Sequence, residues 1–307
     1  PNFILDHNRC ILCRRCVRSC SEQVGNFTLG FEERGAKSLL VADTGVPLGE
    51  STCISCGTCV QVCPTGALID RWSAYRGRET QVEKTKTICV GCSLGCGIDV
   101  LTRDNSLVRI EGDWDSKVNE GVICEVGRFT PMTDKCERLA TPLIRKNGAL
   151  KAATWDEAVS VISAQLKSSP KGIAAAISTR QSVETLYRFK QLFSEKLGSD
   201  SVVTTEEGQY TRESSVLADT LQQTFEGKLS DLFIADSIMV VDENLSKDHQ
   251  VAGFFIKRIL PSGTKLLVVD KQANMLDNHA NKALKTPKGS QSDTLMALTA
   301  AIVKLGL

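Results

Sequence analysis

The sequence repeats one cysteine pattern twice near its start, as Cys10-Ile-Leu-Cys13-Arg-Arg-Cys16-Val-Arg-Ser-Cys20 and as Cys53-Ile-Ser-Cys56-Gly-Thr-Cys59-Val-Gln-Val-Cys63-Pro64. Both copies have the spacing C-x2-C-x2-C-x3-C. Three thiolates at this spacing bind three corners of one iron–sulfur cube, while the fourth cysteine points to a second cube. We therefore predict crossed ligation of two 4Fe-4S clusters, one by Cys10, Cys13, Cys16 and Cys63 and the other by Cys53, Cys56, Cys59 and Cys20.

Over residues 1 to about 75, these motifs resemble the bacterial two-cluster ferredoxin domain. The resemblance implies an α+β ferredoxin-like domain, which we assign to residues 1–80. Zinc is the alternative, because C-x2-C pairs also build structural zinc sites. Zinc sites use two separated pairs, however, whereas each run here adds a third thiolate where a zinc ribbon would have loop.

A third quartet follows, with Cys89, Cys92 and Cys96 in one loop and Cys124 after 27 intervening residues. The segments 98–102 and 107–111 flank Asp104-Asn105 and predict a hairpin. This region, residues 81–137, resembles the small β-rich 4Fe-4S domain at the front of molybdopterin oxidoreductases and of the large cluster-carrying subunit of respiratory complex I. The resemblance implies a third 4Fe-4S cluster on Cys89, Cys92, Cys96 and Cys124.

Cysteine usage divides the chain, because 12 of the 13 cysteines lie within the first 124 residues. The remaining one, Cys136, is expected to be a small buried thiol rather than a ligand. Closely spaced cysteines in a long chain without an apolar signal sequence favour metal-bound thiolates in a reducing compartment. We therefore expect a cytoplasmic protein, attached to a membrane only through a larger complex.

The composition excludes some function classes. A length of 307 residues suggests about two domains. The net charge of +1 gives no general reason to expect a nucleic-acid partner. No apolar run approaches the length of a membrane span, so no transmembrane segment is expected.

The second half predicts alternating strands and helices, which is typical of a parallel sheet covered by helices. Thr154-Trp-Asp-Glu157 predicts a capping box that starts a helix ending near Lys167. The expected strands are 173–178, 202–205, 238–241 and 265–269, and the other expected helices are 182–197, 247–260 and 292–307. Residues 138–307 are therefore assigned to an α/β parallel-sheet domain. Residues 84–307 as a whole resemble the first part of the molybdopterin oxidoreductases.

Two positions depart from the enzymes of that family. They have a lysine two residues after the fourth cysteine, between cluster and pterin, where this sequence has Val126. The position of their metal ligand falls near Gln209, although Ser214 or Ser215 could serve if the alignment shifts by a few residues. The pattern also stops before the remainder of a pterin site. We therefore expect a degenerate domain without molybdopterin, no catalytic residue, and no cofactor besides the clusters.

In its order of domains the chain resembles the complex I large subunit and the iron–sulfur subunits of NAD-linked hydrogenases, formate dehydrogenases and electron-bifurcating ferredoxin–NAD oxidoreductases. Many of those begin with a 2Fe-2S domain and a cluster motif of one histidine and three cysteines, which this sequence lacks. The resemblance implies an oxidoreductase complex with a flavoprotein NADH-binding subunit, a 2Fe-2S subunit and a hydrogenase or formate dehydrogenase catalytic subunit, with ferredoxin as a further partner. The alternatives are the front part of a molybdenum- or tungsten-pterin formate dehydrogenase-like enzyme and a non-redox scaffold.

Overall fold

The computed structural model describes residues 2–169, 172–205, 220–222, 227–241, 244–245 and 247–306. The chain divides into two compact units, one of Pro1–Asp134 with Gly227–Leu307 and the other of Lys135–Glu226. The stretch 138–307, assigned above to one α/β domain, is therefore shared between them. The domain limits 1–80, 81–137 and 138–307 stay predictions.

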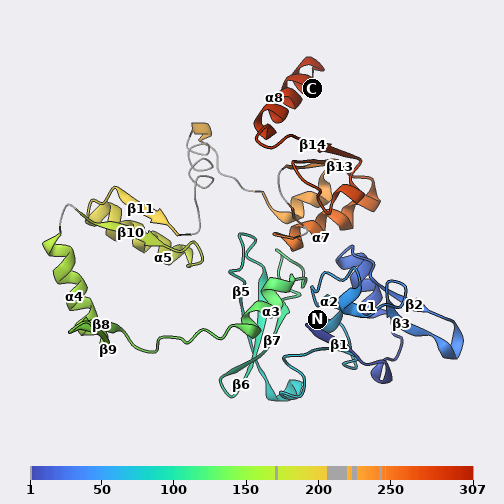
Figure 1. Ribbon diagram of the computed structural model, residues 1–307, viewed down its shortest axis with the longest axis horizontal. Coiled ribbons are helices and arrows are strands. Elements are labelled where there is room, and N and C mark those ends of the chain that lie inside the picture. Colours follow the sequence, from blue (N-terminus) through green and yellow to red (C-terminus); the bar gives the residue numbers. More distant parts are fainter. Residues whose placement is uncertain are drawn as a thin grey trace. The chain divides into compact units, whose positions relative to one another are not determined.

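Figure 1 labels most of the elements of both units. The first unit contains the strands β1 (Phe3–Leu5), β2 (Leu29–Glu32), β3 (Leu39–Ala42), β4 (Leu68–Asp70), β5 (Glu83–Ile88), β6 (Gly97–Arg103), β7 (Ser106–Gly112), β12 (Ser237–Val241), β13 (Lys265–Asp270) and β14 (Lys282–Lys285). Its helices are α1 (Arg15–Arg18), α2 (Thr58–Gln61), α3 (Glu125–Thr133), α7 (Gln250–Ile259) and α8 (Gln291–Lys304). The second unit contains β8 (Leu143–Lys146), β9 (Ala149–Ala152), α4 (Trp155–Ser168), β10 (Ala174–Ile177), α5 (Val183–Lys190) and β11 (Ser201–Thr204).

The region of the two repeated motifs is held together by short antiparallel pairs. Strand β1 pairs with β4, so the two ends of this region meet, and β2 pairs with β3. The short helices α1 and α2 each begin inside a cysteine motif, and a π-helical turn over Ser19–Gln23 extends α1 through Cys20. The core between them contains Phe3, Leu40 and Leu68 together with Cys16 and Cys59.

The third-quartet region is an antiparallel sheet in the order β5-β6-β7, with α3 beside β7 (Figure 1). The predicted hairpin is confirmed, because β6 and β7 pair and Asp104 and Asn105 form its left-handed turn. Each strand is one residue longer at each end than expected. The core of this region is continuous with α7, since Ile98, Ile110 and Val122 belong to the same buried cluster as Phe254 and Phe255.

The predicted parallel pairing in the second half is found in two separate sheets. Strands β12, β13 and β14 pair in parallel in the first unit, and β10 pairs in parallel with β11 in the second unit. The capping box is confirmed: the Thr154 hydroxyl accepts from Glu157 N at 3.2 Å, and the Glu157 carboxylate accepts from Thr154 N at 3.0 Å.

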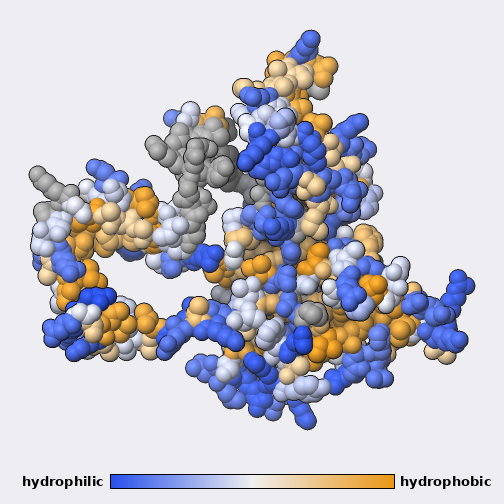
Figure 2. Space-filling view, viewed as in Figure 1, coloured by the Kyte–Doolittle hydropathy of each residue, from blue (hydrophilic) through white to orange (hydrophobic). Residues whose placement is uncertain are grey.

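The second unit buries few of its apolar side chains. Among its described residues, neither α4 nor α5 contains a buried residue, and Trp155 and Val183 are 74% and 78% exposed. Figure 2 shows apolar surface along these elements. In the part of the chain that the structure describes, none of the helices combines the length and the apolar character needed to cross a membrane.

Candidate metal centres

Three cavities in the first unit are each lined by four cysteines. Their cysteine sets are Cys10, Cys13, Cys16 and Cys63; Cys20, Cys53, Cys56 and Cys59; and Cys89, Cys92, Cys96 and Cys124. Each set equals one of the quartets predicted from the sequence. In particular, Cys63 lies with the first motif and Cys20 with the second, which is the exchange that crossed ligation requires.

The first two cavities are of nearly equal size, with about 330 and 350 Å³ of empty space, and the third has about 570 Å³. Equal size and equal donors suit two copies of the same group. In the third, the loops of the sheet region form one wall and residues 247–251 form the other.

Backbone N–H groups point to cysteine sulfurs in all three cavities. Ser55 N donates to Cys53 Sγ, Leu68 N to Cys63 Sγ, Gly91 N to Cys89 Sγ and Gly127 N to Cys124 Sγ, each at 3.4 Å. Donors of this kind stabilise the negative charge on a thiolate and help to set the potential of an iron–sulfur cluster.

Burial dominates the pKa of several of these thiols. It raises the pKa of Cys16 and of Cys53 to about 11 and that of Cys96 to about 12, with neighbouring thiolates adding to each rise. Cys63 is the opposite case: burial raises its pKa, but hydrogen bonds from Leu68 and Thr65 outweigh this and lower it. Buried thiols with raised pKa become thiolates only when a metal replaces the proton.

The four thiols that line each cavity do not converge on a single point. Within the described residues, no three His, Cys, Asp or Glu side chains converge on a position that would hold a single metal ion. The four cysteines of an iron–sulfur cube bind four different irons, so they surround the group instead of converging. The donor set and its spread therefore fit a cluster better than one zinc ion.

The backbone of the two repeated loops is bent in the same way. Leu12 and Arg14 have φ values of 55° and 65°, and the corresponding Ser55 and Gly57 have 55° and 72°. Left-handed residues at these positions turn the chain tightly around each cavity, which is costly for a leucine or an arginine.

Sequence reasoning missed two cations beside the second cavity, Arg128 and Lys257. The Arg128 guanidinium donates to the Cys56 carbonyl oxygen at 2.9 Å, and the Lys257 side chain packs against Gly25. No local motif reveals these contacts, because they join segments that are 72 or more residues apart.

Of the positions at which the sequence departs from a pterin-binding enzyme, the structure describes one, Val126. Val126, which replaces the lysine of the enzymes, is 50% exposed and lines the third cavity, so the bridging amine is absent from that position. Gln209, Ser214 and Ser215 lie outside the described residues.

The expectation that Cys136 is buried is wrong, because the structure has it exposed.

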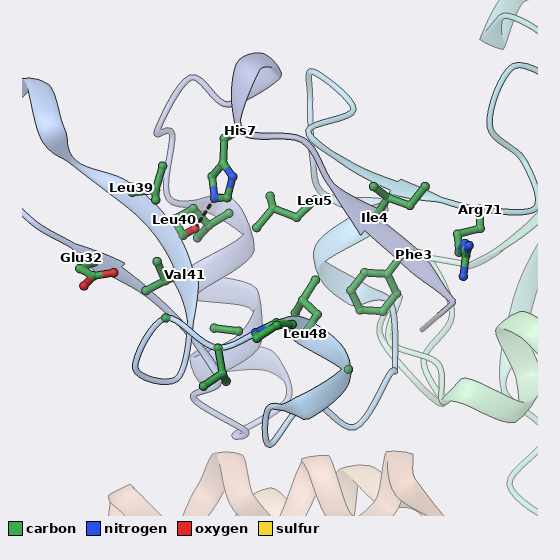
Figure 3. Close-up of a pocket in the computed structure, with 15 residues that line it drawn as sticks. Phe3, Ile4, Leu5, His7, Glu32, Leu39, Leu40, Val41, Leu48 and Arg71 are labelled. Atoms are coloured by element: carbon green, nitrogen blue, oxygen red, sulfur yellow. Dashed lines mark hydrogen bonds between the residues drawn. The ribbon is translucent and has the colours of Figure 1, made fainter.

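A further cavity, with about 1180 Å³ of empty space, lies between β1 and β3 and is lined mainly by apolar side chains (Figure 3). His7 at one side of it is bonded through Nε2 to the Leu40 carbonyl oxygen at 2.7 Å. The described residues that line this cavity include no cysteine.

Family models match most of the chain. The 4Fe-4S dicluster domain matches residues 9–67, and the molybdopterin oxidoreductase Fe4S4 domain matches residues 82–133. The molybdopterin oxidoreductase model matches residues 138–305, which is more than half of the chain. The chain belongs to the molybdopterin oxidoreductase family. This family member therefore has a ferredoxin-like 4Fe-4S domain followed by a molybdopterin oxidoreductase-like domain, as the sequence predicted.

This molybdopterin oxidoreductase family member is similar to three curated proteins. It is 30% identical to an NADH-quinone oxidoreductase subunit of Rhizobium meliloti, over 99% of this chain and 35% of that protein. It is 42% identical to NADH-quinone oxidoreductase subunit 3 of Thermus thermophilus, over 54% of this chain and 21% of that protein. It is 26% identical to a formate dehydrogenase-like protein of Staphylococcus aureus, over 99% of this chain and 36% of that protein. The chain thus spans about a third or less of the length of these relatives.

Proposed function

We propose that the chain is an electron-transfer subunit of an oxidoreductase complex and that it relays single electrons through three 4Fe-4S clusters. The observation that carries the proposal is the grouping of twelve cysteines around three cavities, four to each. A cube with four cysteine ligands has no iron open to substrate, so electron transfer is the chemistry it offers. No residue of this chain is then needed as an acid, a base or a nucleophile.

Contacts between the three sites support a continuous path. Burial raises the pKa of Cys59 well above its usual range, and nearby thiolates raise it further, including Cys16 of the first site. The second and third sites are joined through Arg128, whose N–H bonds to the Cys124 carbonyl oxygen at 3.1 Å while its guanidinium bonds to Cys56. The second cluster would thus lie between the other two along the relay.

The first cluster is proposed as the site of electron exchange with a partner. Residues 11–15 are all exposed, Cys13 among them. Arg14, Arg15 and Arg18 surround this loop with positive charge, although Arg18 is paired with Glu22 at 3.0 Å. A basic, exposed cluster loop suits an acidic electron carrier such as a ferredoxin.

The other partners are proposed from the relatives. Two of these are subunits of NADH-quinone oxidoreductases and one is formate dehydrogenase-like. We propose a flavoprotein NADH-binding subunit and a 2Fe-2S subunit on one side and a formate dehydrogenase or hydrogenase catalytic subunit on the other, in the cytoplasm. We also propose that the domain binds no molybdopterin, since Val126 cannot replace the amine between cluster and pterin.

Metal analysis after anaerobic purification of the full chain tests the relay. The expected content is about 12 iron per chain, the sum of three four-iron clusters, with neither molybdenum nor tungsten. Stoichiometric molybdenum or tungsten with pterin would favour the front part of a formate dehydrogenase-like enzyme instead. Zinc in place of iron, with no EPR signal from clusters after dithionite reduction, would favour a scaffold and refute the relay.

A further inference from the structure

Arg128 is a charged side chain in the interior of the first unit, only 3% exposed. Its guanidinium donates to the Cys56 carbonyl oxygen at 2.9 Å, to the Ile110 carbonyl oxygen at 3.1 Å and to Gln61 Oε1 at 2.8 Å. All three acceptors are neutral. The hydrogen bonds hold the guanidinium in place without neutralising it.

None of the ion pairs among the described residues includes Arg128. The two carboxylates whose fields reach it make no ion pair with it: Asp70 accepts from Trp72 N at 2.7 Å, and Glu111 pairs with Arg109 at 2.8 Å. Burying a cation without an ion-pair partner is energetically unfavourable. An anion beside it would offset this cost, and the adjacent group is the cavity of Cys20, Cys53, Cys56 and Cys59.

Lys257 approaches the same cavity from a different element, α7. Its side chain packs against Gly25, and its ammonium lies 5.6 Å from the centre of the Phe254 ring. Burial lowers its pKa, while the thiolates of Cys56 and Cys20 act in the opposite direction. The next residue, Arg258, differs, because it is paired with Glu120 at 2.8 Å.

The other two cavities have no such pair of cations among the described residues. The arginines at the first loop, Arg14 and Arg15, are exposed to water, which screens them. At the third cavity, Lys247 is exposed and adjacent to the exposed Asp248, and Val126 stands where the enzymes have a lysine. One opposing charge also exists at the second cavity, since Glu125, which accepts from Asn2 at 2.8 Å, acts on Cys53, so a single carboxylate there opposes two cations.

We propose that Arg128 and Lys257 are internal counter-cations of the second cluster and make it the highest-potential centre of the three. The inference rests on the proposed relay. Four thiolates would make the second cluster an anion, and one electron from the reduced first cluster would add one negative charge to it and leave the first cluster oxidised by one electron. No bond forms or breaks in this step. Buried positive charge favours the reduced state, so the electron rests at the middle of the path.

The test is an EPR-monitored redox titration of the full chain with all three clusters loaded, in which Cys20→Ser identifies the signal of the second cluster. Arg128→Gln and Lys257→Met should each reduce the equilibrium constant for reducing that cluster by about tenfold, which is ~59 mV for one electron. The other two signals should keep their potentials. Arg128→Lys should restore most of the shift because it keeps the charge, and Arg15→Gln is the matched exposed control.

Two results would overturn the inference. One is a second cluster that titrates below either of the other two in the unaltered chain. The other is an unshifted second signal in Lys257→Met, a substitution that keeps a long apolar stem of similar size and removes the charge. The failure of the relay itself is distinguishable, because then the unaltered chain gives no cluster signals to titrate.

Discussion

The two repeated loops have nearly the same backbone but opposite surroundings. In the first loop residues 11–15 are all exposed, whereas in the second loop the corresponding residues 54–58 are partly or fully buried. The position after the second cysteine shows the difference: Arg14 extends over the Phe31 ring at 5.8 Å, but a Cβ on Gly57 would lie 2.5 Å from Arg128 Cδ. The bend alone therefore does not require glycine. Gly57 is needed because the third-quartet region packs directly on the second loop.

The comparison separates a surface centre from an internal one within a single duplicated motif. The first site keeps an exposed loop with exposed arginines, which suits exchange with a partner. The second site is covered by α3 and α7, which supply Arg128 and Lys257. The duplicated motif thus provides two equivalent sets of cluster ligands, and the later parts of the chain give the two sites different surroundings.

The largest effect is expected from Cys20→Ser, which tests whether the two motifs share ligands. This change should remove the second cluster although residue 20 belongs to the first motif, because Cys20 lines the second cavity. Iron should fall from about 12 to about 8 per chain, with one EPR signal lost. The mirror variant Cys63→Ser should remove the first cluster, and Cys136→Ser should remove none. Loss of the first cluster in Cys20→Ser would refute crossed ligation.

Substitution by leucine at two corresponding positions, 14 and 57, tests why only the second loop has glycine. Gly57→Leu should destabilise the chain by about 2–5 kcal/mol, combining the cost of a left-handed leucine with overpacking against Arg128 and Phe129. Arg14→Leu should change stability by less than about 0.5 kcal/mol, because Arg14 is already a left-handed side chain at an exposed site. Thermal unfolding under anaerobic conditions measures both. Equal losses in the two variants would mean that the second loop is not covered.

The twelve cysteines could be grouped into quartets from the sequence because ligand spacing is a local property. Sequence reasoning also predicted the β6–β7 hairpin and the start of α4, which depend on turn residues and a capping box. It missed β1, β4 and β14, since strands of three or four residues have too little periodicity to be detected. Arg128 and Lys257 were missed for a different reason: the burial of a cation is decided by segments far apart in the chain, and no spacing rule encodes it.

Charge reversal at the exposed loop tests its role in exchange with a partner. The double change Arg14→Glu and Arg15→Glu should slow electron exchange with an acidic ferredoxin about tenfold at low salt, because electrostatic steering is lost. The difference should shrink as the ionic strength rises. Stopped-flow mixing with reduced ferredoxin measures the rate, and the double change Lys151→Glu on β9 and Lys167→Glu on α4 is the control for net charge. A rate that is unchanged at every salt concentration would mean that the first loop is not the exchange site.

The smallest effect is expected at Leu12, which has the left-handed conformation at 40% exposure. Glycine at this position would remove a backbone cost of about 1–2 kcal/mol from the folded state. It would also increase the conformational entropy of the unfolded chain, which lowers stability by about 0.4–1 kcal/mol. Leu12→Gly should therefore stabilise the chain by about 0.5 kcal/mol, and Ser55→Gly, with the same φ, should do the same. A loss of more than about 1 kcal/mol at Leu12 alone would show that its side chain stabilises the first site by covering it. The first loop would then be shielded by its own leucine, as the second is shielded by the neighbouring helices, and the contrast between the two sites would narrow.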